Sequence, residues 1–101
     1  TNFFFYLGIK LENLVFNVLN QNEKNLTYLR DTYEIDFYTN KTLYQVSYKI
    51  DDEKTLNREL NSFKYFDADF TKEHNLITFN DSKKIDNISV LSIDEFILPP
   101  I

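Results

Sequence analysis

The chain has 101 residues, 43% of them hydrophobic, and a net charge of -5, which predicts one acidic domain with a modest core. It contains no Cys and one His, so disulfides, thiolate metal sites and multi-histidine clusters within it are excluded. The acidic balance argues against broad electrostatic attraction to nucleic acid, which needs clustered Lys and Arg. With Gly8 as the single glycine, neither a P-loop nor a dinucleotide-binding fingerprint is possible.

The sequence predicts neither a membrane span nor a signal peptide. No run of about 18 apolar residues occurs, and the apolar start FFFYLGI lacks a basic leader and a cleavage site. We therefore expect a cytoplasmic location without membrane contact. Methionine is absent, which favours a piece cut from a longer protein over a processed product.

The first part of the chain predicts a surface helix. Residues 2–8 are rich in aromatic side chains and indicate a strand or the stub of a preceding element, so residues 1–7 are assigned to that stub and residues 8–101 to the domain. Between residues 9 and 21, apolar side chains recur at helical spacing, at Leu11, Leu14, Val15, Val18 and Leu19. Glu12 lies at the margin of this stripe, where it is either a solvated residue or a carboxylate at the edge of the sheet.

Residues 33–50 predict a β-hairpin that organises the domain. If Asn40 and Lys41 form a two-residue turn, Asp36 lies directly opposite Gln45. The period of two then separates an apolar core face from a polar face. The apolar face carries Tyr33, Ile35, Phe37, Tyr44, Val46, Tyr48 and Ile50, and the polar face carries Glu34, Asp36, Gln45, Ser47 and Lys49.

The polar face of this hairpin has two interpretations. One is that it meets water, as one face of an antiparallel sheet commonly does. The other is that an acid on one strand, with a Gln and a Lys on the next, forms a site for a divalent cation and a phosphodiester. Oxygen ligands suit the hard cation, and an ammonium group stabilises developing charge on phosphate.

The remaining elements predict an α/β (α+β) domain. A strand at residues 26–30 makes a meander with the hairpin, and a helix from Asp51-Asp52 to about Lys64 covers its apolar face. Strands follow at residues 76–79 and near Ile88, and the capping-box pattern at residues 92–95 opens a short helix. His74 is interpreted as a loop residue. The order α-β-β-β-α-β-β-α predicts a mixed sheet of about five strands flanked by helices.

Several stretches resemble a known family: LENLVFNVL, YEIDFYTN followed by LYQVSYKI, DDEKTLNREL and ISVLSIDEFIL. They resemble the C-terminal domain of unknown function in a group of prokaryotic AAA-type ATPases, over about Gly8 to Leu98. The resemblance implies a restriction-endonuclease-like fold of the PD-(D/E)xK type. It also implies the ATPase portion of the same polypeptide as a partner, with ATPase activity outside this chain, and nucleic acid as a second candidate partner.

The resemblance also assigns the site. Glu12 matches the helical Glu of the family, Asp36 its metal-binding Asp, and Gln45 its acid-or-amide position. Mg²⁺ would be held by these three residues, and Asp36, Gln45 and Lys49 would be catalytic. Ser47 stands where the motif has its Lys, and serine cannot replace that cation. Lys49 lies about 7 Å further along the strand and would have to reach back.

Three functions follow from this interpretation. The favoured one is an accessory domain of an ATPase whose degenerate nuclease site engages nucleic acid or a protein partner. The second is an active Mg²⁺-dependent nuclease in which Lys49 replaces the missing Lys. The third is a protein-interaction domain that docks through the aromatic segment Asn2–Tyr6. The acidic balance favours the first and the third.

Overall fold

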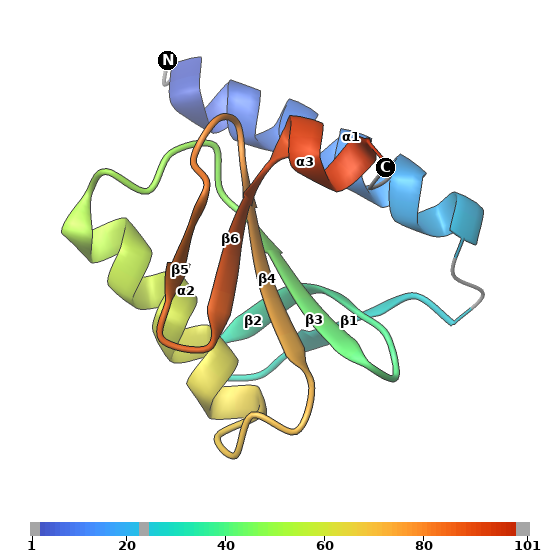
Figure 1. Cartoon of the computed structure of the whole chain (residues 1–101), viewed down its shortest axis with the longest axis vertical. Coiled ribbons are helices and arrows are strands. Elements are labelled where there is room, and N and C mark those ends of the chain that lie inside the picture. The colour runs from blue at the N-terminus through green and yellow to red at the C-terminus, as the bar shows by residue number, and fades with distance from the viewer. Residues whose placement is uncertain (1–2, 23–24, 99–101) are drawn as a thin grey trace.

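The computed structural model describes residues 3–22 and 25–98, and Figure 1 shows how their elements are arranged. Three helices and six strands follow one another in this part of the chain. Their bounds are α1 (Phe3–Asn22), β1 (Thr27–Arg30), β2 (Glu34–Tyr38), β3 (Thr42–Val46), α2 (Glu53–Phe66), β4 (Glu73–Thr78), β5 (Lys83–Ile85), β6 (Ile88–Ser92) and α3 (Ile93–Ile97). The predicted order is confirmed except for one additional strand, β5.

The strands form one mixed sheet with the order β1-β2-β3-β4-β6-β5. β1, β2 and β3 are an antiparallel meander, whereas β3, β4 and β6 run parallel to one another. β5 adds an antiparallel edge beside β6. The predicted mixed sheet is confirmed, but its size is six strands in the described chain and not about five. β5 escapes prediction because it contains two exposed lysines and only one apolar residue.

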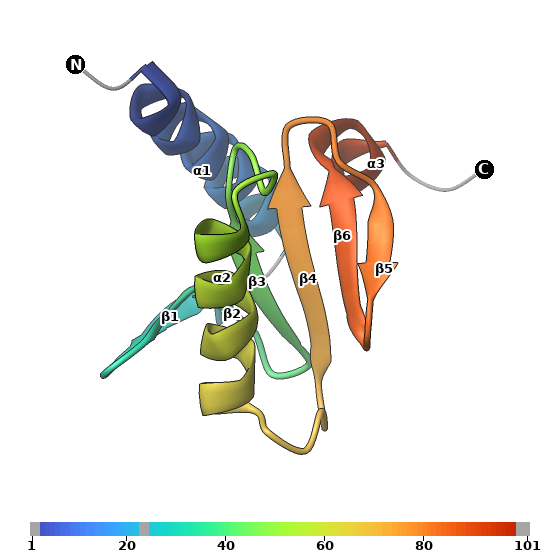
Figure 2. The ribbon, with the colours of Figure 1, turned by 90° about the vertical axis from the view of Figure 1, so that its left-hand side faces the viewer.

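Helices cover both faces of the sheet (Figure 2). On one face, α2 contributes Leu56, Leu60 and Phe63 to a core cluster with apolar side chains of the strands. On the other face, α1 and α3 form a second cluster over the strands, which includes Leu11, Val15, Leu19, Phe37, Ile77 and Ile93. The consecutive residues Leu76 and Ile77 enter opposite clusters. Leu43 and Tyr44 of β3 also enter opposite clusters, so the hairpin packs against both, whereas the prediction buried one face.

α1 begins earlier than predicted. Residues 3–8 continue the helix, so the strand interpretation of the aromatic segment is wrong, while the assignment of residues 1–7 to a preceding element stays a prediction. Phe3 and Phe5 are exposed on this first part of α1. No helix among the described residues is long and apolar enough to cross a membrane, although α1 has 20 residues.

Side-chain caps fix the starts of the two later helices. Asp52 caps α2 by accepting a hydrogen bond from the Lys54 N–H at 3.2 Å. Ser92 and Glu95 form the predicted capping box of α3, in which each side chain bonds to the other residue's backbone N–H. Both caps satisfy N–H groups that have no partner inside the helix. The sequence signals for these two helix starts are confirmed.

His74 lies in β4, so its interpretation as a loop residue is wrong. Its side chain is 0% exposed, and its ring stacks on Phe63, with centroids 4.9 Å apart. Its Nε2 lies 2.8 Å from Oδ2 of Asp67, the residue that ends α2. Burial raises the pKa of Asp67, but hydrogen bonds from His74, Thr71 and the Lys72 N–H outweigh it and hold this pKa well below its usual range. Asp67 thereby joins the end of α2 to the start of β4.

Replacing Asp67 by Asn is expected to lower the free energy of unfolding by about 2 kcal/mol at neutral pH. Both carboxylate oxygens of Asp67 accept hydrogen bonds, and the NH₂ group of Asn cannot accept the bond at its position. Since its folded-state pKa is depressed, the stabilisation by Asp67 is present above the ordinary carboxyl pKa and fades as the pH falls below it. Urea unfolding at neutral and acidic pH measures both effects. Asp69→Asn, an exposed change in the same loop, is the control. Equal midpoints for the two variants would contradict the assigned role.

Candidate functional site

A β-bulge in β2 sets the direction of the residues on which the site depends. Leu29 of β1 lies opposite Ile35 and Thr27 lies opposite Tyr38, so β2 has one residue more than β1 in this stretch. The extra residue interrupts the alternation of side chains. Ile35 consequently joins the cluster with α2, whereas Phe37 joins the cluster with α1. The predicted common face of Ile35 and Phe37 is wrong, because a period of two holds only without a bulge.

The side chain of Gln45 bridges β2 and β3 beside this bulge. The backbone pairs Phe37 with Tyr44, which confirms the predicted hairpin register. One residue further, the Gln45 amide replaces backbone pairing. Its Oε1 accepts the Asp36 N–H at 2.8 Å, and its Nε2 donates to the Glu34 carbonyl at 2.8 Å. Both polar ends of the Gln45 amide are thus bonded to the backbone of β2.

The polar residues at this point lie under α2 and are largely removed from water. Gln45 is 3% exposed and Glu59 of α2 is 7% exposed. Oδ2 of Asp36 accepts the Val46 N–H at 2.8 Å, and no described residue donates a hydrogen bond to Oδ1. The interpretation in which the polar face simply meets water is therefore wrong for Gln45, because a helix covers that face.

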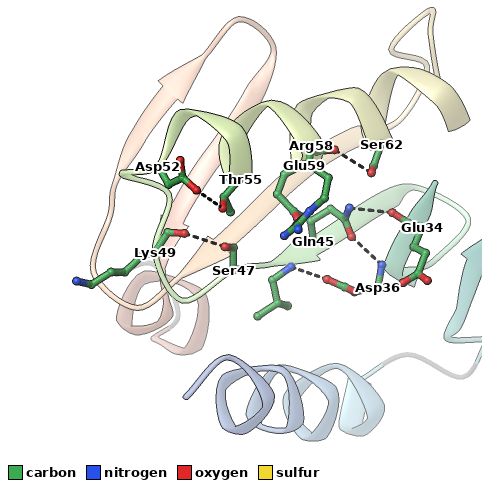
Figure 3. A network of polar contacts seen from close by, with 11 residues as sticks. Glu34, Asp36, Gln45, Ser47, Lys49, Asp52, Thr55, Arg58, Glu59 and Ser62 are labelled. Carbon is green, nitrogen blue, oxygen red and sulfur yellow. Dashed lines mark hydrogen bonds and ion pairs between the residues drawn. The ribbon is translucent and has the colours of Figure 1, made fainter. Parts of the chain in front are cut away.

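These residues line a cleft of about 680 Å³ between α1, α2 and the sheet, and Figure 3 shows the bonds that Gln45 and Asp36 make in it. Glu12 enters the cleft from α1, Asp36 and Gln45 from the sheet, and Arg58 and Glu59 from α2. The Arg58 guanidinium lies 3.4 Å from the Glu59 carboxylate. The structure therefore brings the three residues predicted to bind metal into one cleft.

Burial, assisted by neighbouring charges, raises the pKa of three carboxyl groups in the cleft. Burial, partly offset by the Val46 N–H, raises the pKa of Asp36 to about 7, with further increases from the charges of Glu12, Glu59 and Glu34. Burial and the charge of Glu34 also raise the pKa of Glu12. Burial raises the pKa of Glu59, although Arg58 opposes this. Burial and like charge thus make these three carboxyl groups harder to ionise than exposed ones.

The cleft offers oxygen atoms of the kind that Mg²⁺ prefers, but they are spread apart. Carboxylates of Glu12 and Asp36 suit a hard cation, and Gln45 lies beside them with Oε1 bonded to a backbone N–H. Among residues 3–22 and 25–98, no three His, Asp or Glu side chains gather as a metal-binding group. Binding of Mg²⁺ by Glu12, Asp36 and Gln45 stays a prediction.

Lys49 lies outside the cleft. Ser47, the residue after the end of β3 at Val46, still lines the cleft with Asp36, whereas Lys49 does not. Figure 3 shows the Lys49 side chain directed away from Asp36. Its Nζ lies 4.2 Å from the centre of the Phe4 ring of α1, and the Ser47 hydroxyl donates to the Lys49 carbonyl at 2.9 Å. The structure therefore does not bring Lys49 to Asp36 and Gln45.

Sequence reasoning missed the charged residues that α2 contributes to the cleft, Arg58 and Glu59. Glu59 lies at helical spacing from Leu56 and Phe63, so it falls within the apolar stripe of α2. A charged residue inside such a stripe indicates a buried charge with a special environment. Arg58, the cation of the cleft, carries no comparable signal, because a basic residue on a helix surface is ordinary.

Replacing Asp36 by Asn is expected to stabilise the fold at alkaline pH. A carboxyl pKa raised from 3.8 to about 7 means that the folded chain holds this proton more tightly than the unfolded chain. The free energy of unfolding therefore falls as the pH rises through this window. The Asn variant should lack this decline and exceed the parent by on the order of 2 kcal/mol at about pH 8. Thermal unfolding across this pH range measures the difference, and parallel pH profiles for the parent and Asp36→Asn would refute the prediction. Asp51→Asn, a change at an exposed position, is the control.

Replacing Gln45 by Leu is expected to lower the free energy of unfolding by about 2–4 kcal/mol. The apolar side chain fills a similar space but leaves the Asp36 N–H and the Glu34 carbonyl without their partner. Urea unfolding measures the change. Gln21→Leu, on the exposed side of α1, controls for the change of residue type. If both variants unfold at the same urea concentration, Gln45 does not bridge the strands in solution.

Comparison with known proteins assigns no family to the chain. No protein-family model, no curated protein and no solved structure matches it. A restriction-endonuclease-like identity therefore rests on the residues that carry the resemblance and stays a proposal.

Proposed function

We propose that this chain is an accessory, restriction-endonuclease-like domain of an AAA-type ATPase, with a cleft that binds a partner but does not hydrolyse phosphodiesters. The attachment to an ATPase comes from the sequence resemblance alone. The type of fold is supported by a mixed sheet in which α1 and the two strands of the hairpin supply one cleft with Glu12, Asp36 and Gln45.

The main support for a site without nuclease activity is the pair of hydrogen bonds that Gln45 makes. A metal ligand needs an oxygen that can turn to face the ion, but the orientation of the Gln45 amide is fixed at both ends: Oε1 accepts the Asp36 N–H and Nε2 donates to the Glu34 carbonyl. Turning this amide toward a metal ion would break the bridge between β2 and β3. A cation could then be held by two carboxylates at most, and weakly.

An active nuclease would also need a cation beside the reacting phosphate. The predicted cation, Lys49, lies against Phe4 and not in the cleft. Arg58 lines the cleft, but its guanidinium is paired with the Glu59 carboxylate at 3.4 Å. The active-nuclease alternative thus requires rearrangement of two side chains and has less support than the degenerate site.

Calorimetric titration of Mn²⁺ and Mg²⁺ into the chain and into Asp36→Ala tests this proposal. We expect binding that is weak or absent in the parent and absent in the variant. In a parallel assay with Mg²⁺, single- and double-stranded DNA and RNA should be cut no faster by the parent than by Asp36→Ala. Asp51→Ala serves as the control for removal of an exposed carboxylate.

Metal-dependent cleavage that is lost in Asp36→Ala would overturn the proposal. In that event, Lys49→Ala and Arg58→Ala identify the cation in use, because only the residue that faces the phosphate should be required. Tight metal binding that vanishes in Asp36→Ala, even without cleavage, would also contradict a site from which Gln45 is withdrawn.

A further inference from the structure

The charges that face the cleft are unfavourable for a phosphodiester. Glu12, Glu34, Asp36 and Glu59 supply four acidic side chains, and they come from α1, β2 and α2. Arg58 is the one basic residue lining the cleft in the described chain, and it lies against Glu59. Without a bound metal ion, an anionic ligand would meet repulsion that a single arginine cannot balance. The cleft therefore favours a cation.

The same cleft has aromatic walls. Phe4 and Phe5 of α1 line it together with Tyr33 and Tyr48, so rings and carboxylates face one ligand volume. An aromatic face attracts a cation within about 6 Å of its centre. The chain demonstrates this on the same wall, because the ammonium of Lys49 lies 4.2 Å from the Phe4 centroid. A bound basic side chain would make the same type of cation–π contact.

The walls are held before any ligand arrives. Tyr48 stacks on Phe79 with centroids 5.0 Å apart and an interplanar angle of 17°. The Val46 N–H fixes one oxygen of Asp36, which leaves Oδ1 without a hydrogen-bond donor among the described residues. Little conformational freedom at these two positions remains to be lost on binding, which favours affinity.

We propose that the cleft between α1 and α2 binds a basic side chain, preferentially arginine, that a protein partner presents. A guanidinium is planar and weakly hydrated, so it can stack on a ring while its N–H groups reach carboxylates. The volume of about 680 Å³ holds such a side chain with its neighbouring residues. The inference rests on the proposed function, since it gives a partner to a cleft that does not perform phosphodiester chemistry.

Titration of the complete chain with blocked tripeptides, followed by amide NMR signals, tests this inference. The probes are acetyl-Gly-Arg-Gly-amide, its lysine counterpart and its citrulline counterpart, which keeps the shape of arginine without the charge. We expect the arginine peptide to shift cleft signals with a dissociation constant on the order of millimolar. The citrulline peptide should bind at least about tenfold more weakly. Added salt should weaken the arginine complex.

Two variants locate the binding. Asp36→Asn and Glu12→Gln should each weaken binding of the arginine peptide about tenfold, whereas Asp51→Asn should leave it unchanged. Equal binding of arginine and citrulline peptides, or unchanged binding in both cleft variants, would overturn the inference. Binding of an oligothymidine at the same signals without Mg²⁺ would overturn it too, because the repulsion argument would fail.

The outcomes separate this inference from the proposed function. Absence of both peptide binding and nucleic-acid cleavage removes the basic-peptide inference and leaves the degenerate nuclease-like domain standing. Mg²⁺-dependent cleavage would overturn the proposed function, whatever the peptides do.

Discussion

The candidate site depends on one interaction, the bridge that the Gln45 side chain makes between β2 and β3. The regular pairing of β2 with β3 ends at Phe37 and Tyr44, next to the bulge that β2 forms against β1. Without the bridge, the next N–H and carbonyl groups of β2 would be left unpaired near a covered face, which is costly. With it, the strands stay together while Asp36 turns its carboxylate into the cleft. One amide thus supports the sheet and sets the position of the acid.

The cleft requires a stable frame, because like charges at its walls oppose folding. α2 provides that frame through its two ends. Asp52 caps its start, and Asp67 at its end accepts hydrogen bonds from the loop and from His74 of β4. The Phe63 side chain is fully buried on the same helix. Glu59 is therefore held against the cleft by contacts made one to two turns away.

Much of the fold follows from local patterns in the sequence. The turn at Asn40 and Lys41 gives the observed pairing of Phe37 with Tyr44, and the Ser92–Glu95 pattern gives the observed cap. These features are local, so the residues that specify them are adjacent in the chain. The turn and the cap can therefore be predicted without knowing which helices and strands pack against them.

The features that the sequence does not reveal depend on contacts between distant segments. The bulge arises from how β1 pairs with β2, and the strand position of His74 depends on Phe63 and Asp67, which lie in another part of the chain. The direction of Lys49 could not be extrapolated, because this residue lies three positions beyond the end of β3 at Val46. Glu12, Asp36 and Gln45 were placed in one cleft by resemblance and period together, but the bonds that occupy Gln45 required the structure.

The same contacts decide which kind of cation suits the cleft. A small divalent ion needs several oxygen atoms at short, nearly fixed distances, and the bridge withdraws Gln45 from that set. A guanidinium tolerates carboxylates that are spread over a larger volume, and it gains from aromatic faces that a hydrated metal ion does not use. Acids on α1, β2 and α2 with rings between them form such a spread arrangement. The features that weaken the cleft as a nuclease site are therefore the ones that suit it to a large organic cation.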